Sequence, residues 1–247
     1  MSAVGNDLRS VLVLAPMPIE LAPVAKRLRL ARAGGSDGDD LRRGRVGGIE
    51  VVAALGGIGT AAAAVIARRM IEAHDPDLVV VCGVAGGLGP TVQIGDLVVP
   101  ETVTDLDTGA TYAPTPLGDA QPAGRLVTSG ELITDRSVLQ AHADAGVVAI
   151  DMETAAIAAE SQAAGKPWIA FRGISDHLRD DLIDEQTSGL MHDDGRPNVA
   201  ALARYVARRP ANVGRLAKMA KGTKAATTVA TRALQRALEA EIAASRG

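Results

Sequence analysis

Three carboxylates in this sequence stand just after short apolar segments, where a folded chain could use them for acid–base chemistry. They are Glu20 after Val11–Leu14, Glu153 after Val147–Ile150 and Asp176 after Trp168–Gly173. Ligands of open α/β sheets bind beyond the carboxyl ends of the strands, which is where these residues fall. Two such groups can serve as proton donor and proton acceptor, provided that an apolar environment raises the pKa of the donor.

Each carboxylate also has a purely structural interpretation. Asp176 suits a helix N-cap, and Glu20 suits a first helical turn, where the helix dipole favours an acidic residue. Glu153 suits an exposed helix surface. Position alone favours the structural interpretation of Glu20 and Asp176.

A glycine-rich segment, Gly83–Gly87, follows the apolar run Leu78–Cys82. Residues without a bulky side chain let the backbone approach a ligand closely. The alternative is a tight strand-to-helix turn, and both can hold at once. Because glycine-rich loops also bind phosphate, a phosphate ligand has to be weighed as well.

Apolar strands that alternate with helices predict a three-layer α/β/α fold with a central mixed, mostly parallel sheet. The expected strands are Val11–Leu14, Ile49–Leu55, Leu78–Cys82, Asp96–Val99, Val147–Ile150 and Trp168–Gly173. The expected helices are Ile19–Leu30, Ala61–Ala73 and Met152–Ala164. We expect a surface turn over Ala33–Asp40 and a long loop over Thr104–Gly124.

The composition is that of a soluble globular protein: of 247 residues, 47% are hydrophobic and 22% are charged. The N-terminus has no basic segment ahead of an apolar one, so we expect no secretory signal. The only cysteine, Cys82, fits a reducing cytoplasm. Without clustered Cys and His we expect no metal site, and without interleaved aromatic and basic residues no nucleic-acid partner.

The charge is divided unevenly along the chain. Residues 195–247 carry +9 and residues 1–194 carry −12. This predicts a catalytic domain over 1–194 and a basic helical C-terminal extension over 195–247, with helices from Val199 and over Val213–Ala244, the second weakened near Gly222.

Four segments in order resemble the nucleoside phosphorylase and nucleosidase superfamily. They are Leu14–Leu21, Gly57–Gly59, Asp75–Val99, and Asp151–Ala156 together with Phe171–Asp176. Within that superfamily the chain is most similar to 5′-methylthioadenosine/S-adenosylhomocysteine nucleosidases. The resemblance implies cleavage of the N-glycosidic bond of an adenosine-type nucleoside with a substituted 5′ position.

The resemblance also assigns roles. Asp176 would protonate the purine and Glu20 would activate water, while Glu153 would hold the ribose hydroxyls and Met152 would pack against the sugar or base. The other implied substrate-binding residues are Val84, Ala85, Gly86, Ile133, Thr134 and Ser175. No cofactor is implied, and the implied assembly is a homodimer or larger.

Some residues depart from the family pattern. Val84 stands where nucleosidases usually have Ser, and Ile133 stands where they place an aromatic ring against the base. The family's phosphorylases hold phosphate with arginines, but the loop Ala15–Glu20 has no basic residue. A carboxylate at Glu20 would repel phosphate, which favours water, although Arg172 and Arg45 could reach the site from elsewhere.

Two alternatives stay open: a phosphorylase acting on a lipid-linked or soluble nucleoside, and a nucleoside-binding protein without turnover. The basic C-terminal segment resembles that of hopanoid-associated phosphorylase-like proteins. An amphipathic basic helix suits the inner face of an anionic membrane, and packing on the domain is an equal alternative.

Overall fold

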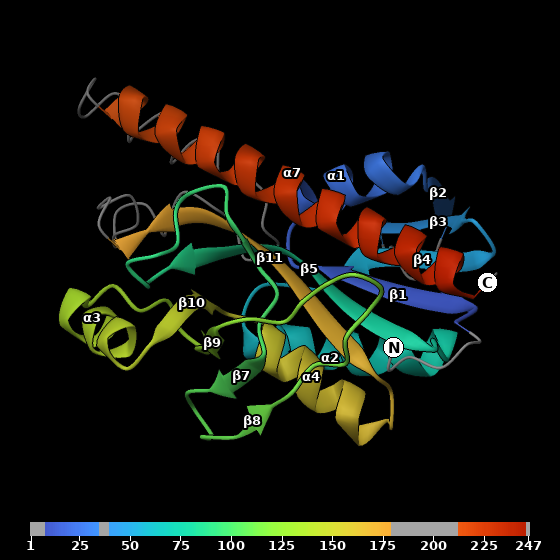
Figure 1. Ribbon diagram of the computed structural model, residues 1–247, viewed down its shortest axis with the longest axis horizontal. Coiled ribbons are helices and arrows are strands. Elements are labelled where there is room, and N and C mark those ends of the chain that lie inside the picture. The colour runs from blue at the N-terminus through green and yellow to red at the C-terminus, as the bar shows by residue number, and fades with distance from the viewer. Residues whose placement is uncertain (1–7, 35–39, 179–211, 246–247) are drawn as a thin grey trace.

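The computed structural model describes residues 8–34, 40–178 and 212–245. A twisted sheet lies between two layers of helices (Figure 1). Helices α1 (Pro18–Leu28) and α7 (Asn212–Ala244) cover one face, and α2 (Thr60–His74) and α4 (Thr154–Ala163) cover the other. A further helix, α3 (Arg136–Asp144), lies beside β10 (Val147–Asp151). The three-layer α/β/α arrangement expected from the sequence is confirmed.

The sheet is mixed and branches at β5 (Leu78–Gly87), which pairs with β1, β10 and β11. Its main path runs β2-β3-β4-β1-β5-β10-β9-β7-β8, and β11 pairs with both β5 and β6. Parallel pairing joins β1 to β4 and β5, β11 to β5, and β9 to β7 and β10. The strands are β1 (Ser10–Ala15), β2 (Ala31–Gly34), β3 (Asp40–Val46), β4 (Ile49–Leu55), β5 (Leu78–Gly87), β6 (Leu97–Val98), β7 (Thr102–Asp105), β8 (Thr111–Tyr112), β9 (Arg125–Thr128), β10 (Val147–Asp151) and β11 (Trp168–His177).

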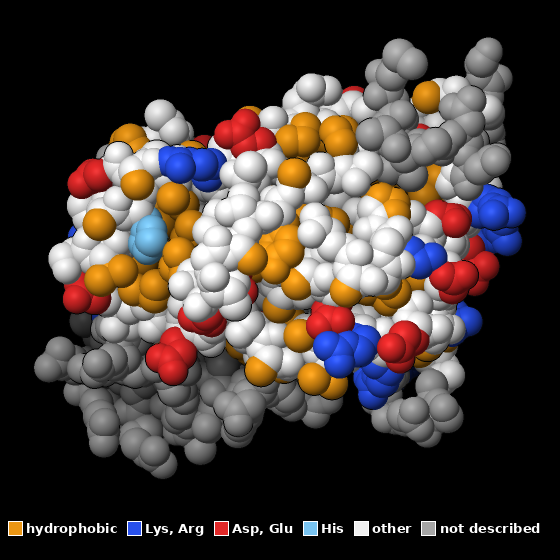
Figure 2. Space-filling view, turned by 90° about the horizontal axis from the view of Figure 1, so that it is seen from below, with side chains coloured by type: hydrophobic (Ala, Val, Ile, Leu, Met, Phe, Trp, Pro, Cys, Tyr) orange, Lys and Arg blue, Asp and Glu red, His pale blue; other side chains and the backbone are white. Residues whose placement is uncertain are grey.

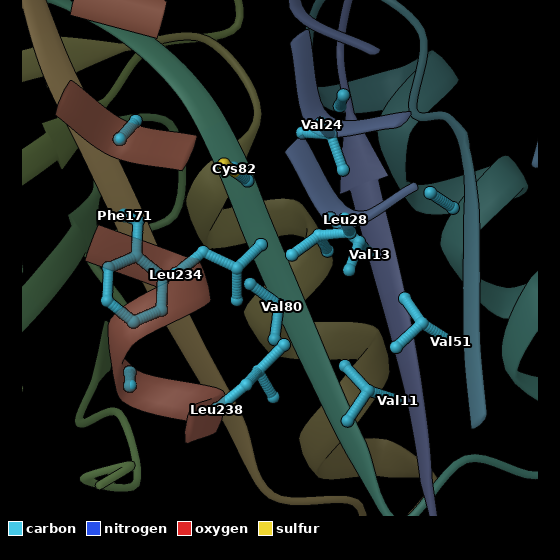
Figure 3. Packing of buried hydrophobic residues seen from close by; sticks show 14 of the residues in the cluster. Val11, Val13, Val24, Leu28, Val51, Val80, Cys82, Phe171, Leu234 and Leu238 are labelled. Atoms are coloured by element: carbon cyan, nitrogen blue, oxygen red, sulfur yellow. The ribbon is translucent and has the colours of Figure 1, made fainter. Parts of the chain in front are cut away.

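Alternate residues of the central strands enter two separate cores. Val13 of β1 and Val80 of β5 belong to the core beneath α1 and α7, whereas Leu14 and Val81 belong to the core beneath α2 and α4. Figure 3 shows the first of these cores, in which Leu234 of α7 lies near Val80. Successive side chains of a strand point to opposite faces of the sheet, and both faces are buried here. Side chains on both faces of these strands are therefore apolar, which gives a continuous apolar run in the sequence.

Helix α7 is part of this packing. Its buried residues Ala230, Leu234 and Leu238 lie in the same core as β1 and β5. The buried carboxylate of Glu241 accepts a hydrogen bond from the backbone N–H of Gly118 at 3.1 Å. This part of the basic segment therefore packs on the sheet, while the predicted boundary at residue 195 and the helix from Val199 lie outside the described residues.

Two glycines bring the backbone of α7 against the backbone of β11. A methyl group on Gly173 would overlap the carbonyl oxygen of Ala226, and one on Gly222 would overlap that of Ser175. We expected α7 to weaken near Gly222. It runs through this position unbroken, because glycine there permits contact with β11.

Other expectations need correction. The glycine-rich segment is not a turn but the end of β5, which continues to Gly87. The segment expected as a long loop contains β8 and the end of β7, and the expected turn over Ala33–Asp40 overlaps the ends of β2 and β3. Short polar strands of this kind lack the apolar pattern that identifies a strand in a sequence.

The contact at Gly222 predicts opposite effects for two matched substitutions in α7. Gly222→Ala should lower the free energy of unfolding by about 1–3 kcal/mol, because the added methyl meets the Ser175 carbonyl. Gly214→Ala should raise it by up to about 1 kcal/mol, because nothing lies within 4 Å and alanine favours the helix. Urea denaturation measures both, and equal effects would contradict the contact.

Candidate functional site

Glu20 is buried at the first turn of α1, with 1% of its surface exposed. Its Oε2 accepts a hydrogen bond from the backbone N–H of Met17, and its Oε1 accepts one from that of Val84, both at 2.7 Å. The side chain thus joins the loop after β1 to β5. The structural interpretation as a first-turn residue describes its place in the helix, but not the burial of its carboxylate.

Arg172 of β11 is fully buried beside this carboxylate. Its Nε donates to Asp151 Oδ2 at 2.8 Å, and its Nη2 donates to Glu153 Oε2 at 3.0 Å. Its Nη1 has no hydrogen-bond partner among the described residues. A methyl group on Gly83 would overlap Glu20 Oε1 and would lie 2.7 Å from Nη1, so a glycine is needed where these two groups face β5.

Asp151 connects this cluster to the surrounding elements. It accepts a hydrogen bond from Thr128 Oγ1 at 2.6 Å and a second from the hydroxyl of Thr154. These bonds link β9, the end of β10 and the start of α4 to the guanidinium of Arg172.

Glu153 is 6% exposed and precedes α4 as its N-cap residue. Its Oε1 accepts from the backbone N–H of Gly59 at 3.1 Å, and its Oε2 accepts from Arg172. Its interpretation as an exposed helix residue is therefore wrong. Each carboxylate oxygen has two lone pairs, so each can accept a further bond from a ligand.

The electrostatic balance of the cluster shifts three pKa values. Burial raises the pKa of Glu20 to about 7, and Glu153 adds to the rise, while Arg172 and the two backbone N–H groups oppose it. Burial likewise raises the pKa of Glu153, against the effect of Arg172. Burial alone would lower the pKa of Arg172, but Asp151, Glu153 and Glu20 together raise it.

Asp176 lies near the end of β11, beyond an irregularity in the pairing with β5 between Ile174 and Asp176. Such irregularities redirect side chains. Ser175 Oγ donates to Asp176 Oδ1 at 2.5 Å, and Oδ2 would lie 3.4 Å from a methyl group on Gly86. Asp176 is a strand residue, so its interpretation as a helix N-cap is wrong.

The two carboxylates proposed for acid–base chemistry thus lie against one short stretch of β5. Glu20 bonds to the backbone of Val84, and Asp176 lies opposite Gly86, with Ala85 between. Val84 takes part through its backbone N–H, which does not depend on the hydroxyl that nucleosidases usually have here.

The remaining predicted residues are less closely tied to this cluster. Met152 is half-buried between Asp151 and Glu153. Ile133 and Thr134 lie in the segment after β9, whose Gly130 carbonyl would lie 3.8 Å from a methyl group on Gly59. Arg45 is not part of the site, because it is exposed on β3 and donates to the carbonyl of Gly48.

The sequence carries one further signal for this network. Arg172 stands in an otherwise apolar strand, Trp168–Ile174. A buried arginine requires carboxylate partners, and the pair Asp151 and Glu153 after another strand supplies them. Among the described residues, no group of three or more His, Cys, Asp or Glu side chains has an arrangement suited to a metal ion.

The raised pKa of Glu20 predicts how stability depends on pH. Because the folded value is about 7 and the ordinary value is 4.5, the folded protein holds an extra proton between them. The free energy of unfolding should therefore fall as pH rises through this window, with the full contribution present below it. Urea denaturation measures the free energy of unfolding of the wild type and of Glu20→Gln. The value for the wild type minus that for the variant should fall as pH rises to about 7, and should then stay constant. A difference that stays constant with pH would contradict the shift.

Comparisons with known proteins identify the family and the fold. A sequence model of the phosphorylase superfamily matches residues 10–128 and 123–209. The 5′-methylthioadenosine/S-adenosylhomocysteine nucleosidase of Chromohalobacter salexigens is 28% identical over 199 residues, covering 68% of this chain and 85% of that protein.

Two solved structures have the same fold. The corresponding nucleosidase of Neisseria meningitidis, in complex with methylthio-immucillin-A, has a TM-score of 0.70 at 19% identity, covering 94% of this chain and 99% of that one. Futalosine hydrolase of Helicobacter pylori has a TM-score of 0.67 at 14% identity, covering 96% and 98%. Since the superfamily model matches well over half of the sequence, the chain belongs to the phosphorylase superfamily.

Proposed function

We propose that this protein hydrolyses the N-glycosidic bond of an adenosine-type purine nucleoside with a substituted 5′ position. The observation that carries the proposal is the buried carboxylate of Glu20, held by two backbone N–H groups beside Arg172, with a pKa of about 7. A general base is most effective when its pKa lies near the operating pH.

Glu20 and Arg172 together provide what an attacking water needs. Nη1 of Arg172 is a buried donor without a partner among the described residues, and both it and Glu20 Oε1 lie against Gly83. A water bound there would satisfy Nη1 and pass its proton to Glu20 as its oxygen bonds to the anomeric carbon of the ribose. The glycosidic bond breaks in the same process, and its electrons go to the purine.

Asp176 would neutralise the leaving purine by donating a proton to its N7. The hydrogen bond from Ser175 holds Oδ1, and Gly86 leaves room beside Oδ2. Protonation makes the base a better leaving group, and the ribose resembles a ribosyl cation in the transition state.

Glu153 would bind the ribose hydroxyls. Both of its oxygens are fixed by protein donors, Gly59 and Arg172, and both keep a lone pair for a hydroxyl. Its negative charge would also stabilise the ribosyl cation. These steps use protein side chains and water alone.

We propose methylthioadenosine and S-adenosylhomocysteine as substrates, on the strength of the relatives' named activity. Met152, Ile133 and Thr134 would contact the sugar and base. With Ile133 in place of an aromatic ring, the contact to the base would be aliphatic.

Phosphate as the nucleophile is less favoured by the charge of the cluster. Among the described residues of the cluster, three carboxylates, those of Glu20, Asp151 and Glu153, lie around one guanidinium, that of Arg172, so acidic groups outnumber basic ones there. A phosphate dianion would be repelled there.

We further propose a cytoplasmic homodimer that can also contact the inner membrane face through its basic C-terminal segment. The face opposite α7 has patches of apolar side chains suited to a subunit contact (Figure 2), and Val65 of α2 is 66% exposed. None of the helices in the described ranges is long and apolar enough to cross a membrane. Sedimentation and vesicle flotation measure these two properties.

The reaction itself gives a direct test. Incubation with methylthioadenosine, S-adenosylhomocysteine, adenosine and inosine should release adenine from the 5′-substituted nucleosides at the same rate with and without phosphate. Release that requires phosphate and yields a pentose 1-phosphate would establish a phosphorylase. Binding without release at high protein concentration would establish a non-catalytic binding protein.

Asp176→Asn should reduce turnover by about 10²-fold or more, because the amide cannot donate a proton as an acid does. The variant should still bind the nucleoside and keep the folded structure. Adenine release under saturating substrate measures the effect, with Asp144→Asn, at the end of α3, as a surface control. Turnover equal to that of the wild type would remove Asp176 from the reaction.

A further inference from the structure

A cavity lies apart from the cluster around Arg172. It has a volume of about 970 Å³ and is bounded by α1, by β3 and by one side of α7. These two helices lie side by side on one face of the sheet (Figure 1). The volume falls at the upper end of the range typical of small-molecule sites.

Five cationic side chains line this cavity: Lys26, Arg27, Arg29, Arg45 and Lys224. Of the described lining residues only Glu239 is acidic, and it already accepts a hydrogen bond from Gln235 at 2.8 Å. No ion pair between described residues involves any of the five. The described lining of the cavity therefore has a net positive charge, in a chain whose net charge is −3.

The helix dipole explains only part of this arrangement. Lys26 and Arg27 lie in the last turn of α1, where the dipole favours basic residues. Arg45 comes from β3 and Lys224 from the middle of α7, where no helix terminus attracts them. Their convergence on one cavity suits an anionic ligand.

Two threonine hydroxyls in the cavity require that the ligand also carry hydrogen-bond donors. Thr228 Oγ1 donates to the carbonyl of Lys224 at 2.6 Å, and Thr231 Oγ1 donates to that of Thr227 at 2.8 Å. Because these hydroxyl protons are already used, the oxygens can only accept hydrogen bonds from a ligand. Thr228 and Thr231 are about 6 Å and 10 Å along α7 from Lys224.

We propose that this cavity binds a phosphate ester of a polyol. The phosphate lies among Lys26, Arg27 and Lys224, and the hydroxyls of the polyol donate to Thr228 and Thr231. A free polyol phosphate and a phospholipid with a glycerol headgroup share this chemistry. The proposal does not depend on the reaction proposed for the other site.

Calorimetric titration of the full-length protein with glycerol 3-phosphate at low ionic strength tests the site. We expect saturable binding at one site per chain and at least about ten-fold weaker binding in Lys224→Glu, since a charge-assisted contact becomes a repulsion. Arg236→Glu makes the same charge change on an exposed residue of the same helix outside the cavity, and should bind as the wild type does. Circular dichroism checks that the variants are folded.

Thr228→Val tests the assignment of the polyol. It keeps the shape of the side chain and removes the acceptor, so it should weaken binding of glycerol 3-phosphate and leave binding of inorganic phosphate unchanged. Equal weakening of both ligands would overturn the polyol assignment.

Flotation with phosphatidylglycerol vesicles, compared with phosphatidylcholine vesicles, distinguishes the two sources. If the protein floats with phosphatidylglycerol vesicles, Lys224→Glu abolishes this flotation and free glycerol 3-phosphate does not bind, the ligand is the lipid headgroup. If glycerol 3-phosphate binds and the protein does not float, the ligand is a soluble polyol phosphate. The proposal is overturned if neither probe binds, or if Arg236→Glu weakens binding as much as Lys224→Glu does.

Discussion

The positive charge of Arg172 lies in the interior of the protein, and the candidate site depends on how that charge is balanced. Moving a guanidinium out of water costs several kcal/mol, which is offset only when its carboxylate partners are well placed. Asp151 and Glu153 meet this condition with direct hydrogen bonds, and each is held in turn by other donors. Four elements, β9, β10, α4 and β11, are thereby fixed around one point.

The same balance sets the chemical character of Glu20. Its burial would raise its pKa strongly, and Arg172 limits that rise to a value of about 7. The residue can therefore exchange a proton near neutral pH while remaining shielded from solvent. A carboxylate in water, with its ordinary pKa, would be a much weaker base.

Helix α7 bears on this geometry through backbone contact with β11. Gly173 and Gly222 let α7 lie directly on β11, next to Ser175 and Asp176. The position of Asp176 thus depends on a helix that shares no sequence motif with it. The cavity between α1 and α7 is lined by another part of the same helix, and its lining does not include Arg172.

The sequence by itself determined the layered fold and the places where chemistry could occur. Apolar runs such as Val11–Leu14 and Trp168–Gly173 identify buried strands, and Glu20, Glu153 and Asp176 follow such runs. It could not reveal that the glycine-rich segment continues β5, because glycine is equally common in turns. Nor could it reveal the partners of Arg172, the pairing irregularity before Asp176 or the packing of α7.

These features were decided only by the tertiary structure, because each depends on contacts across long sequence separations. Glu20 is bonded to Val84, and Gly59 is bonded to Glu153, yet 64 and 94 residues separate the members of these pairs. Local patterns report which face of a strand or helix is apolar. Burial and nearby charge, which set a pKa, arise only once distant segments have come together.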